Sequence, residues 1–216
     1  MKKLFSSLSR GVIMLFALGI MGIFMNARSF VTSFLPAVSF EDLLDGEKVK
    51  EGSHVAGNVV FSMDPFASES TYTKYKDGSR SGDRKSGNYY TIPTADGYIA
   101  LKSTQKEVSS LNQLVDETYI YIDGGEEPAT MVRIEGEVHT LEPELVKYFR
   151  EYLVDMGYTE EEIDNMGDFQ VIKSIPFLYI RIMFSLSIVC LLLAVGIVLR
   201  RCCQPPLPVG RVSELD

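Results

Sequence analysis

The sequence predicts an α+β protein: a small Greek-key β-barrel of the OB type with inserted helices, flanked by two transmembrane helices. Two observations support this fold class. Uninterrupted apolar segments lie near both ends of the chain, at Gly11–Met25 and Ile182–Leu199. Between them, strand and helix patterns follow an order close to that of an OB fold, which has three strands, a helix and two more strands.

The second apolar segment is the stronger candidate for a membrane span. From Phe177 to Leu199 its only charged residue is Arg181, and a helix of this length reaches roughly 34 Å, enough to cross a hydrocarbon core of about 30 Å. The first segment is shorter and fits either a cleaved signal peptide or an uncleaved anchor. A large residue where cleavage requires a small one favours the anchor, residues 11–30.

Positive charges flank both spans on the side of the chain termini. Because such charges are retained in the cytoplasm, we expect residues 1–10 and 200–216 to be cytoplasmic and residues 38–175 to lie outside the cell. The protein is then a two-span protein of the cell membrane, in contact with the lipid bilayer. The flanking basic residues are Lys2, Lys3 and Arg10 before the first span and Arg200 and Arg201 after the second.

The segment between the spans is strongly acidic. Residues 38–175 hold 27 acidic and 13 basic side chains, a net charge of −14, and the rest of the chain carries +6. This acidity is typical of a soluble surface and argues against binding of nucleic acid or anionic lipid, since both need clustered Lys or Arg. The three cysteines, Cys190, Cys202 and Cys203, lie in or after the second span, so the domain must fold without a disulfide.

The first half of the domain begins with a short helix and a strand. Ser39, with Asp42 three residues later, forms a capping box, so a helix should start soon after the first span. The β-branched and apolar residues of His54–Met63 predict a strand. Residues 64–88 are dense in Ser, Gly, Asp and Lys, which predicts a long mobile loop or an irregular hairpin.

A hairpin and a helix follow. Tyr89–Pro93 and Tyr98–Lys102 flank Asp96-Gly97, a dipeptide that favours a tight hairpin turn. Thr104 with Glu107 is a second capping-box pattern, which predicts that a helix starts here. The apolar face of this helix should consist of Val108, Leu111, Leu114 and Val115.

Residues Met131–Leu141 alternate between apolar and polar side chains, which predicts a half-buried strand. Successive side chains of a strand point to opposite faces. We therefore expect Val138 to face the core and its neighbour Glu137 to be exposed on the opposite face.

Two helices and a strand complete the domain. Pro143 at a first helical position and Gly157 beyond the last turn bound one helix. Thr159 with Glu162 caps one further turn. The chain then returns as a strand over Phe169–Ile175 into the second span.

Two stretches of this domain carry a resemblance. The tyrosine-containing hairpin Asn88–Leu101 and the glycine-containing strand and helix start Ile134–Leu145, placed between two spans, resemble uncharacterised two-span membrane proteins of gut Firmicutes with an OB-like extracytoplasmic domain. The resemblance implies a Gram-positive bacterial setting. It implies no activity.

Patterns that suggest catalysis are weak. Ser103 and Lys106 have the SxxK spacing of penicillin-binding enzymes, but the companion SDN and KTG motifs are missing. The glycines of Gly82–Gly87 have P-loop spacing without the Lys and Ser or Thr that hold phosphate and magnesium. We therefore predict no catalytic residue and no cofactor.

Metal-binding patterns are equally weak. His54 and His139 are far apart in sequence and both lie in strand patterns, so we interpret them as ordinary strand-surface residues. The acidic run Glu160–Asp164 lacks EF-hand spacing, and it fits a solvated helix start. No metal site is predicted.

Two features lie on the cytoplasmic side. Cys202 and Cys203 are interpreted as reduced thiols at the membrane interface. Pro205–Pro208 favours polyproline II and resembles an SH3 ligand, but the following Arg211 is one residue too late for the usual PxxPxR form. We interpret it as a short stiff tail.

We expect the protein to be non-enzymatic and to present its acidic domain outside the cell for interaction or sensing. One alternative is an accessory subunit of a larger transporter or envelope enzyme, bound through the spans; another is a hydrolase with an unrecognised site. The expected contact surface is the cationic and aromatic part of residues 64–88, with a membrane protein or an anionic envelope ligand as partner. Its residues are Phe66, Tyr72, Lys74, Tyr75, Lys76, Arg80, Arg84 and Lys85.

Overall fold

The computed structural model describes residues 9–203, which form two compact units. One unit contains the chain up to Ala27 together with the chain from Leu178 onward, and the other is Arg28–Phe177. The polyproline tail Pro205–Pro208 and the basic residues Lys2 and Lys3 lie outside the described residues.

The first unit consists of two long apolar helices, α2 (Arg10–Thr32, which continues into the second unit) and α7 (Phe177–Cys203). Both are long and apolar enough to cross a membrane. They approach each other at Gly19 and Gly22, where an added Cβ would overlap Leu191 and Ser187 of α7. Small residues allow such close backbone approach between apolar helices.

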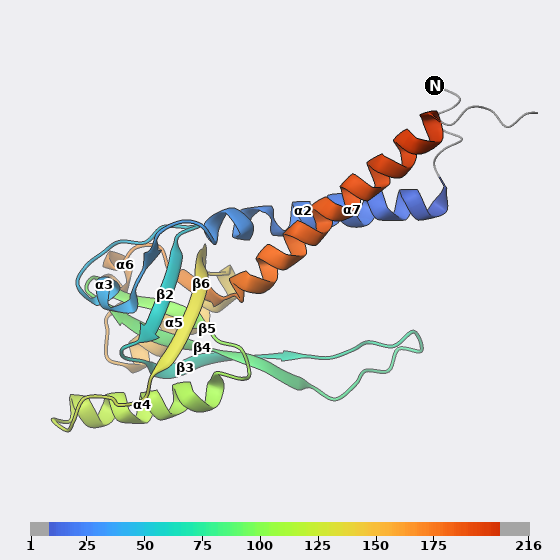
Figure 1. Cartoon of the computed structure of the whole chain (residues 1–216). Coiled ribbons are helices and arrows are strands. Elements are labelled where there is room, and N and C mark those ends of the chain that lie inside the picture. The colour runs from blue at the N-terminus through green and yellow to red at the C-terminus, as the bar shows by residue number, and fades with distance from the viewer. Residues whose placement is uncertain (1–8, 204–216) are drawn as a thin grey trace, which may run out of the picture. The chain divides into compact units, whose positions relative to one another are not determined.

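The second unit has an α+β fold built on a seven-stranded mixed sheet in the order β1-β2-β6-β7-β5-β4-β3 (Figure 1). β1 pairs with β2 and β5 pairs with β7 in parallel, and the other neighbours are antiparallel. The strands are β1 (Ala37–Val38), β2 (His54–Val59), β3 (Met63–Thr71), β4 (Arg84–Thr94), β5 (Gly97–Lys102), β6 (Val132–Thr140) and β7 (Gln170–Ser174).

The sheet is open, because β1 and β3 form its two edges. The predicted OB-like barrel is therefore not confirmed. Helices cover both faces: α3 (Phe40–Leu44) and α4 (Val108–Ile122) contribute to one apolar cluster, and α5 (Pro143–Asp155) and α6 (Glu160–Asn165) to the other. With both faces buried by helices, the sheet does not need to close on itself to form a core.

Neighbouring tyrosines of β4 show this arrangement. Tyr90 is fully buried in the cluster with Leu111 and Leu114 of α4, whereas Tyr89 belongs to the cluster with Phe149 and Leu153 of α5. Because successive side chains of a strand point to opposite faces, both faces of β4 are core faces. The domain is a three-layer helix–sheet–helix structure.

Most local signals in the sequence are confirmed. The capping boxes at Ser39 and Thr159 are both formed. Pro143 is the first residue of α5, and Gly157 follows its end with φ of 101°. This left-handed conformation is one that glycine adopts without strain.

Two local predictions are wrong in detail. The Thr104–Glu107 pattern was expected to start a helix, but it forms a turn before α4. In this turn the Glu107 carboxylate accepts a hydrogen bond from the Thr104 backbone N–H at 2.7 Å. The β4–β5 turn is Ala95-Asp96, one residue earlier than expected, because Gly97 already pairs with Thr94. Both differences are small shifts along the chain.

The segment 64–88 forms an irregular hairpin. β3 pairs with β4 from Met63 opposite Thr91 to Thr71 opposite Arg84, with three register shifts. Only residues 72–83 connect the strands. The hairpin alternative is therefore confirmed, and the long-loop alternative is wrong.

The largest correction concerns Glu137, which was expected to be exposed. Its side chain is 0 % exposed, because the last turns of α2 cover this face of β6. Arg28 Nε donates to Glu137 Oε1 at 2.7 Å, and the Ser29 hydroxyl donates to Oε2 at 2.9 Å. Val138 is fully buried on the other face, as predicted.

Candidate functional site

The candidate site is the tip of the β3–β4 hairpin, residues 72–83, which is held by its own hydrogen bonds. At the turn, the Tyr75 N–H donates to the Ser79 carbonyl at 2.8 Å. Asp77 Oδ1 accepts from both the backbone N–H and the hydroxyl of Ser79, at 3.0 and 2.7 Å. Gly78 has φ of 86°, a conformation in which a side chain would be strained. The sequence Asp-Gly-Ser thus specifies a closed turn.

Below the turn, the two arms of the tip remain paired. Lys74 and Arg80 form a β-bridge, and the backbone N–H groups of Thr73 and Ser81 donate to Ser81 Oγ and the Thr73 carbonyl at 2.8 and 2.9 Å. The Arg80 guanidinium lies 5.2 Å from the ring centroid of Tyr72, within cation–π range. The cationic and aromatic side chains therefore extend from a backbone that is held in one conformation by hydrogen bonds between the two arms.

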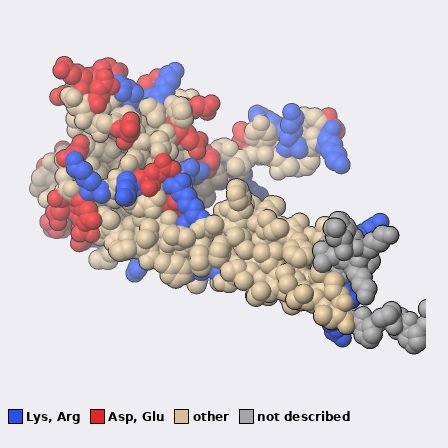
Figure 2. All heavy atoms as spheres, turned by 90° about the horizontal axis from the view of Figure 1, so that it is seen from above, with Lys and Arg blue, Asp and Glu red and all other residues tan. Residues whose placement is uncertain are grey.

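The charge of the hairpin is opposite to that of the domain that carries it. Residues 71–85 contain five basic and two acidic side chains, a net charge of +3. The rest of the segment 38–175 holds 25 acidic and 8 basic side chains, a net charge of −17. Figure 2 shows Lys and Arg gathered on the projecting hairpin and Asp and Glu spread over the body. Tyr72 and Tyr75 are 54 % and 53 % exposed.

The structure brings seven of the eight predicted residues together. Tyr72, Lys74, Tyr75, Lys76 and Arg80 lie in the tip, and Arg84 and Lys85 begin β4.

Phe66 is the exception. It is half-buried on β3, with its ring centroid 4.6 Å from that of Phe149 and 5.9 Å from that of Tyr89. It therefore packs against the core and does not belong to the contact surface. Composition alone could not separate it from the exposed tyrosines nearby.

The root of the hairpin is fixed by a carboxylate. Glu69 of β3 accepts hydrogen bonds from Lys102 Nζ of β5 at 2.8 Å and from the Ser86 hydroxyl of β4 at 3.0 Å. The hydrogen bond from Lys102 holds the pKa of Glu69 below its ordinary value, with a further contribution from Ser86. Three strands are thus tied together where the hairpin leaves the sheet.

A second polar cluster surrounds Glu137 and was missed in the sequence. Arg28 also pairs with Glu51 at 3.0 Å, and the His139 ring nitrogen lies 4.0 Å from Glu137 Oε2. Burial lowers the pKa of His139. The one available signal was Arg28, a charge near the end of an otherwise apolar helix.

The sequence suggested that His54 is a strand-surface residue, and this interpretation is wrong. It is buried, with Nδ1 3.0 Å from the Leu35 carbonyl and Nε2 3.3 Å from Glu135. Its ring packs edge-to-face on Phe177. Within residues 9–203, no group of three or more His, Cys, Asp or Glu side chains has the arrangement of a metal site.

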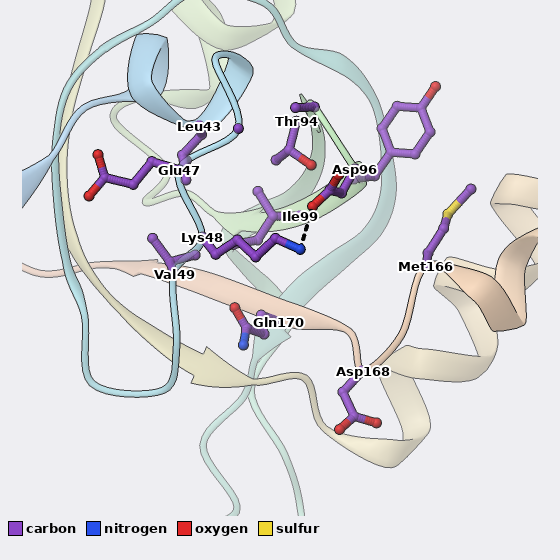
Figure 3. A pocket seen from close by; sticks show the side chains of 13 residues that line it. Leu43, Glu47, Lys48, Val49, Thr94, Asp96, Ile99, Met166, Asp168 and Gln170 are labelled. Carbon is purple, nitrogen blue, oxygen red and sulfur yellow. Dashed lines mark ion pairs between the residues drawn. The ribbon is translucent and has the colours of Figure 1, made fainter.

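A shallow pocket of about 230 Å³ lies between the loop after α3, the β4–β5 turn and the chain before β7. In Figure 3, Lys48 and Asp96 are joined by an ion pair, and Glu47 and Asp168 point elsewhere. The pair measures 3.0 Å and both partners are mostly exposed. Lys48 and Asp96 neutralise each other, and the remaining carboxylates of the pocket do not point to a common centre.

The remaining sequence motifs have structural partners. The Ser103 hydroxyl is buried and donates to the Asn88 carbonyl at 3.2 Å, while Lys106 is exposed. A Cβ on Gly87 would overlap the Ser103 carbonyl, which accounts for glycine there.

The acidic run at the start of α6 is also paired. Arg150 of α5 donates to Glu160 and Asp164, in the latter case at 2.8 Å. Two carboxylates of this acidic run are thus neutralised by a protein cation.

The model of a protein family, a domain of unknown function (DUF8577), matches residues 1–200. The chain belongs to this family. The DUF8577 match includes α2, the whole α+β domain and α7 as far as Arg200, so the family is defined by the two apolar helices together with the domain. No curated protein and no solved structure matches the chain.

Proposed function

We propose that the protein is a non-enzymatic bacterial membrane protein that uses its hairpin tip to contact an anionic partner outside the cell. The observation that carries this proposal is the tip itself. The ordered hairpin carries five cations over residues 71–85, three of them in the tip (Lys74, Lys76 and Arg80), together with two exposed tyrosines, on a domain of opposite charge. Exposed aromatic and basic side chains in one patch are typical of contact surfaces.

The membrane setting is part of the proposal. Helices α2 and α7 cross the bilayer, both termini are cytoplasmic, and Arg28–Phe177 lies outside the cell. The apolar length of both helices and the basic residues at their terminal ends support this topology.

Cysteine labelling tests the topology. In a chain whose native cysteines are replaced by Ser, Asp83→Cys at the exposed hairpin should react with an impermeant maleimide on intact cells. In a second chain, in which Cys203 is kept as the only thiol, that thiol should react only after permeabilisation. External labelling of Cys203 would contradict the two-span arrangement.

Shortening the hairpin tests the contact. Because Thr71 pairs with Arg84, residues 72–83 can be replaced by Asn-Gly, a dipeptide that closes a two-residue hairpin. This variant should keep the fold and lose a salt-sensitive interaction with the anionic partner, measured by crosslinking in cells. A matched chain with the tip intact but with Lys48→Gln, also an exposed cation, should retain it. Unchanged crosslinking of the shortened chain would exclude the tip.

A second candidate function is that of an accessory subunit bound through the helices. It is supported by an apolar groove of about 430 Å³ between α2 and α7, lined by side chains such as Leu18, Met25, Met183 and Leu186. The glycines that allow close packing are already used between α2 and α7, so a partner helix would contact this groove. Met183→Trp should then reduce co-purification of a stoichiometric membrane partner, whereas shortening the hairpin should not.

A further inference from the structure

The end of helix α4 is an exposed apolar surface with an acidic border. Four successive residues, Tyr119–Ile122, are exposed there, with Ile120 and Ile122 at 57 % and 56 %. Met131, beyond the following loop, is 81 % exposed. The whole α4 end, residues 116–131, holds five acidic side chains and no basic one. Exposed apolar patches with a polar border are typical of protein contact surfaces.

The α4 end is held in one conformation by hydrogen bonds. The Glu117 carboxylate accepts from the backbone N–H groups of Ala129 and Thr130 at 2.8 and 2.7 Å. The Gly125 N–H donates to the Ile120 carbonyl at 2.8 Å. The loop after α4 is thus tied back to the helix, and the exposed apolar side chains belong to an ordered surface.

The α4 end and the hairpin tip lie at opposite ends of one edge of the sheet. The edge strand β3 has a strand neighbour on one side only and runs from Met63 to Thr71, after which the tip begins. At its start, the Tyr119 hydroxyl of α4 donates to Asp64 at 2.8 Å. In Figure 1 the hairpin and the loop after α4 accordingly lie at opposite ends of this unit. Within one chain, the two surfaces therefore point away from each other.

The two surfaces are complementary in charge and in apolar character. The hairpin residues 71–85 carry five basic and two acidic side chains, of which three cations and both carboxylates lie in the tip. The α4 end has a net charge of −5. Tyr72 and Tyr75 add exposed rings that match the exposed apolar side chains of the α4 end. Surfaces with such complementarity associate specifically.

A two-fold arrangement of two copies brings these surfaces together twice. Two β3 edges placed side by side and antiparallel put the tip of each copy at the start of β3 in the other. From Thr71, the turn at Gly78 is roughly 23 Å away in one direction and Met63 roughly 26 Å away in the other. With the two-fold axis near Thr71, each tip reaches the level of the α4 end of the second copy. Such a self-complementary contact closes on itself as a dimer.

We propose that the anionic partner of the hairpin is the α4 end of a second copy of this chain, in a two-fold dimer joined along the β3 edges. This inference rests on the proposed function, since it names the partner of the same tip. The hairpin and the α4 end both belong to the unit Arg28–Phe177. Each contact is small, so we expect the dimer to form where copies are concentrated in a membrane and to dissociate on dilution in detergent.

Crosslinking between two differently tagged copies tests the contact. In full chains whose native cysteines are replaced by Ser, one copy carries Thr73→Cys in the tip and the other carries Ala129→Cys in the α4 end, both at exposed positions. The two copies are expressed together, and their membranes are treated with a short bismaleimide. In the matched control, the second copy carries Ser110→Cys, an exposed position near the other end of the same helix.

We expect the Thr73→Cys and Ala129→Cys copies to crosslink at least about fivefold more than the control pair, because the contact holds the two thiols together. About 0.5 M NaCl should remove this difference, since the contact is electrostatic. Equal crosslinking of the test and control pairs would overturn the proposal. A chain carrying both Thr73→Cys and Ala129→Cys should give dimers only, and a ladder of larger products would overturn the two-fold arrangement.

Exchanging charges gives a second measurement. Lys74→Glu with Arg80→Glu in the Thr73→Cys copy should lower crosslinking about threefold, because like charges then meet. Adding Glu126→Lys with Glu127→Lys to the other copy should restore it, since opposite charges face each other again.

The control for the exchange places the same two charges elsewhere. Glu144→Lys with Glu161→Lys, at exposed positions of α5 and α6, gives the same net charge and should not restore crosslinking. Restoration by this pair as well, or no restoration by the pair in the α4 end, would contradict a contact between the tip and the α4 end.

The outcome separates this inference from the proposed function. If the two copies do not crosslink but shortening the hairpin still abolishes a salt-sensitive crosslink in cells, the tip has another anionic partner and only the second copy is excluded. If the crosslink between copies is the one that depends on the tip, both proposals are supported. If no crosslink of either kind depends on the tip, both fail.

Discussion

The hairpin tip and the Glu137 cluster use charge in opposite ways. Both contain arginine in an acidic domain, but Arg80 lies on an exposed tip over Tyr72, whereas Arg28 pairs with a carboxylate that has no solvent exposure. A charge in water costs little to place and contributes little to folding. A buried charge must be paired, and removing its partner is strongly destabilising.

The comparison shows why similar residues have different roles in the two regions. The tip can change its sequence without disturbing the sheet, because none of its side chains contributes to the two apolar clusters. Glu137 cannot be replaced without such a disturbance, because Arg28 and Ser29 of α2 both donate hydrogen bonds to its carboxylate. The tip is suited to contact with a partner, and Glu137 to holding the end of α2, residues 28–32, against the sheet.

The largest effect should come from Glu137→Lys. It places a second cation beside Arg28 at a buried position, so we expect a loss of about 3–5 kcal/mol in the free energy of unfolding, similar to that of Val138→Asp on the other face. Chemical unfolding of the full chain in detergent measures it. Glu126→Lys, at an exposed position of the loop after α4, should cost less than about 0.5 kcal/mol. A Glu137→Lys chain as stable as the Glu126→Lys chain would contradict the buried ion pair.

Ser29→Ala should have an intermediate effect. It removes the hydroxyl that donates to Glu137 Oε2 at 2.9 Å and leaves Arg28 in place. Hydrogen bonds to charged groups contribute about 1.5–3 kcal/mol, and we expect a loss near the lower limit. Ser70→Ala, an exposed serine on β3, serves as the control in the same unfolding measurement. Equal stability of the two variants would mean that Arg28 alone satisfies Glu137.

The root of the hairpin should give a smaller, pH-dependent effect. The folded-state pKa of Glu69 is lowered, first by the hydrogen bond from Lys102. The contribution of Glu69 to stability is therefore complete above its ordinary pKa of 4.5 and is lost as the pH falls through the folded pKa. Because Glu69 is partly exposed, we expect Glu69→Gln to cost less than about 1 kcal/mol at pH 7. The stability difference from the native chain should disappear in acid; a constant difference would refute the ionic origin.

The smallest effect should come from the tip. Replacing residues 72–83 by Asn-Gly should change the free energy of unfolding by less than about 0.5 kcal/mol, because shortening a surface connection alters loop entropy only slightly. Differential scanning calorimetry of the full chain measures this. A loss comparable to that of Ser29→Ala would show that the tip packs on the body, which would remove the contrast between the two regions.

Local signals in the sequence determined many elements of the fold. The apolar helices, the capping boxes at Ser39 and Thr159, and the limits of α5 between Pro143 and Gly157 all follow from residues within one or two helical turns. The cationic tip was also visible, because its charges are neighbours in the chain. Such features depend on short-range chemistry, which a sequence displays directly.

The tertiary structure alone decided the sheet order and the burial of particular side chains. Residues Tyr89–Ile92 are buried at four successive positions, a run typical of a strand covered on both faces, but strand pairing such as β5 with β7 joins distant segments. Glu137 and Arg28 are 109 residues apart, so alternation in β6 placed Glu137 on the polar face without indicating that a helix covers it. Burial depends on what packs from elsewhere in the chain, and no local pattern specifies that.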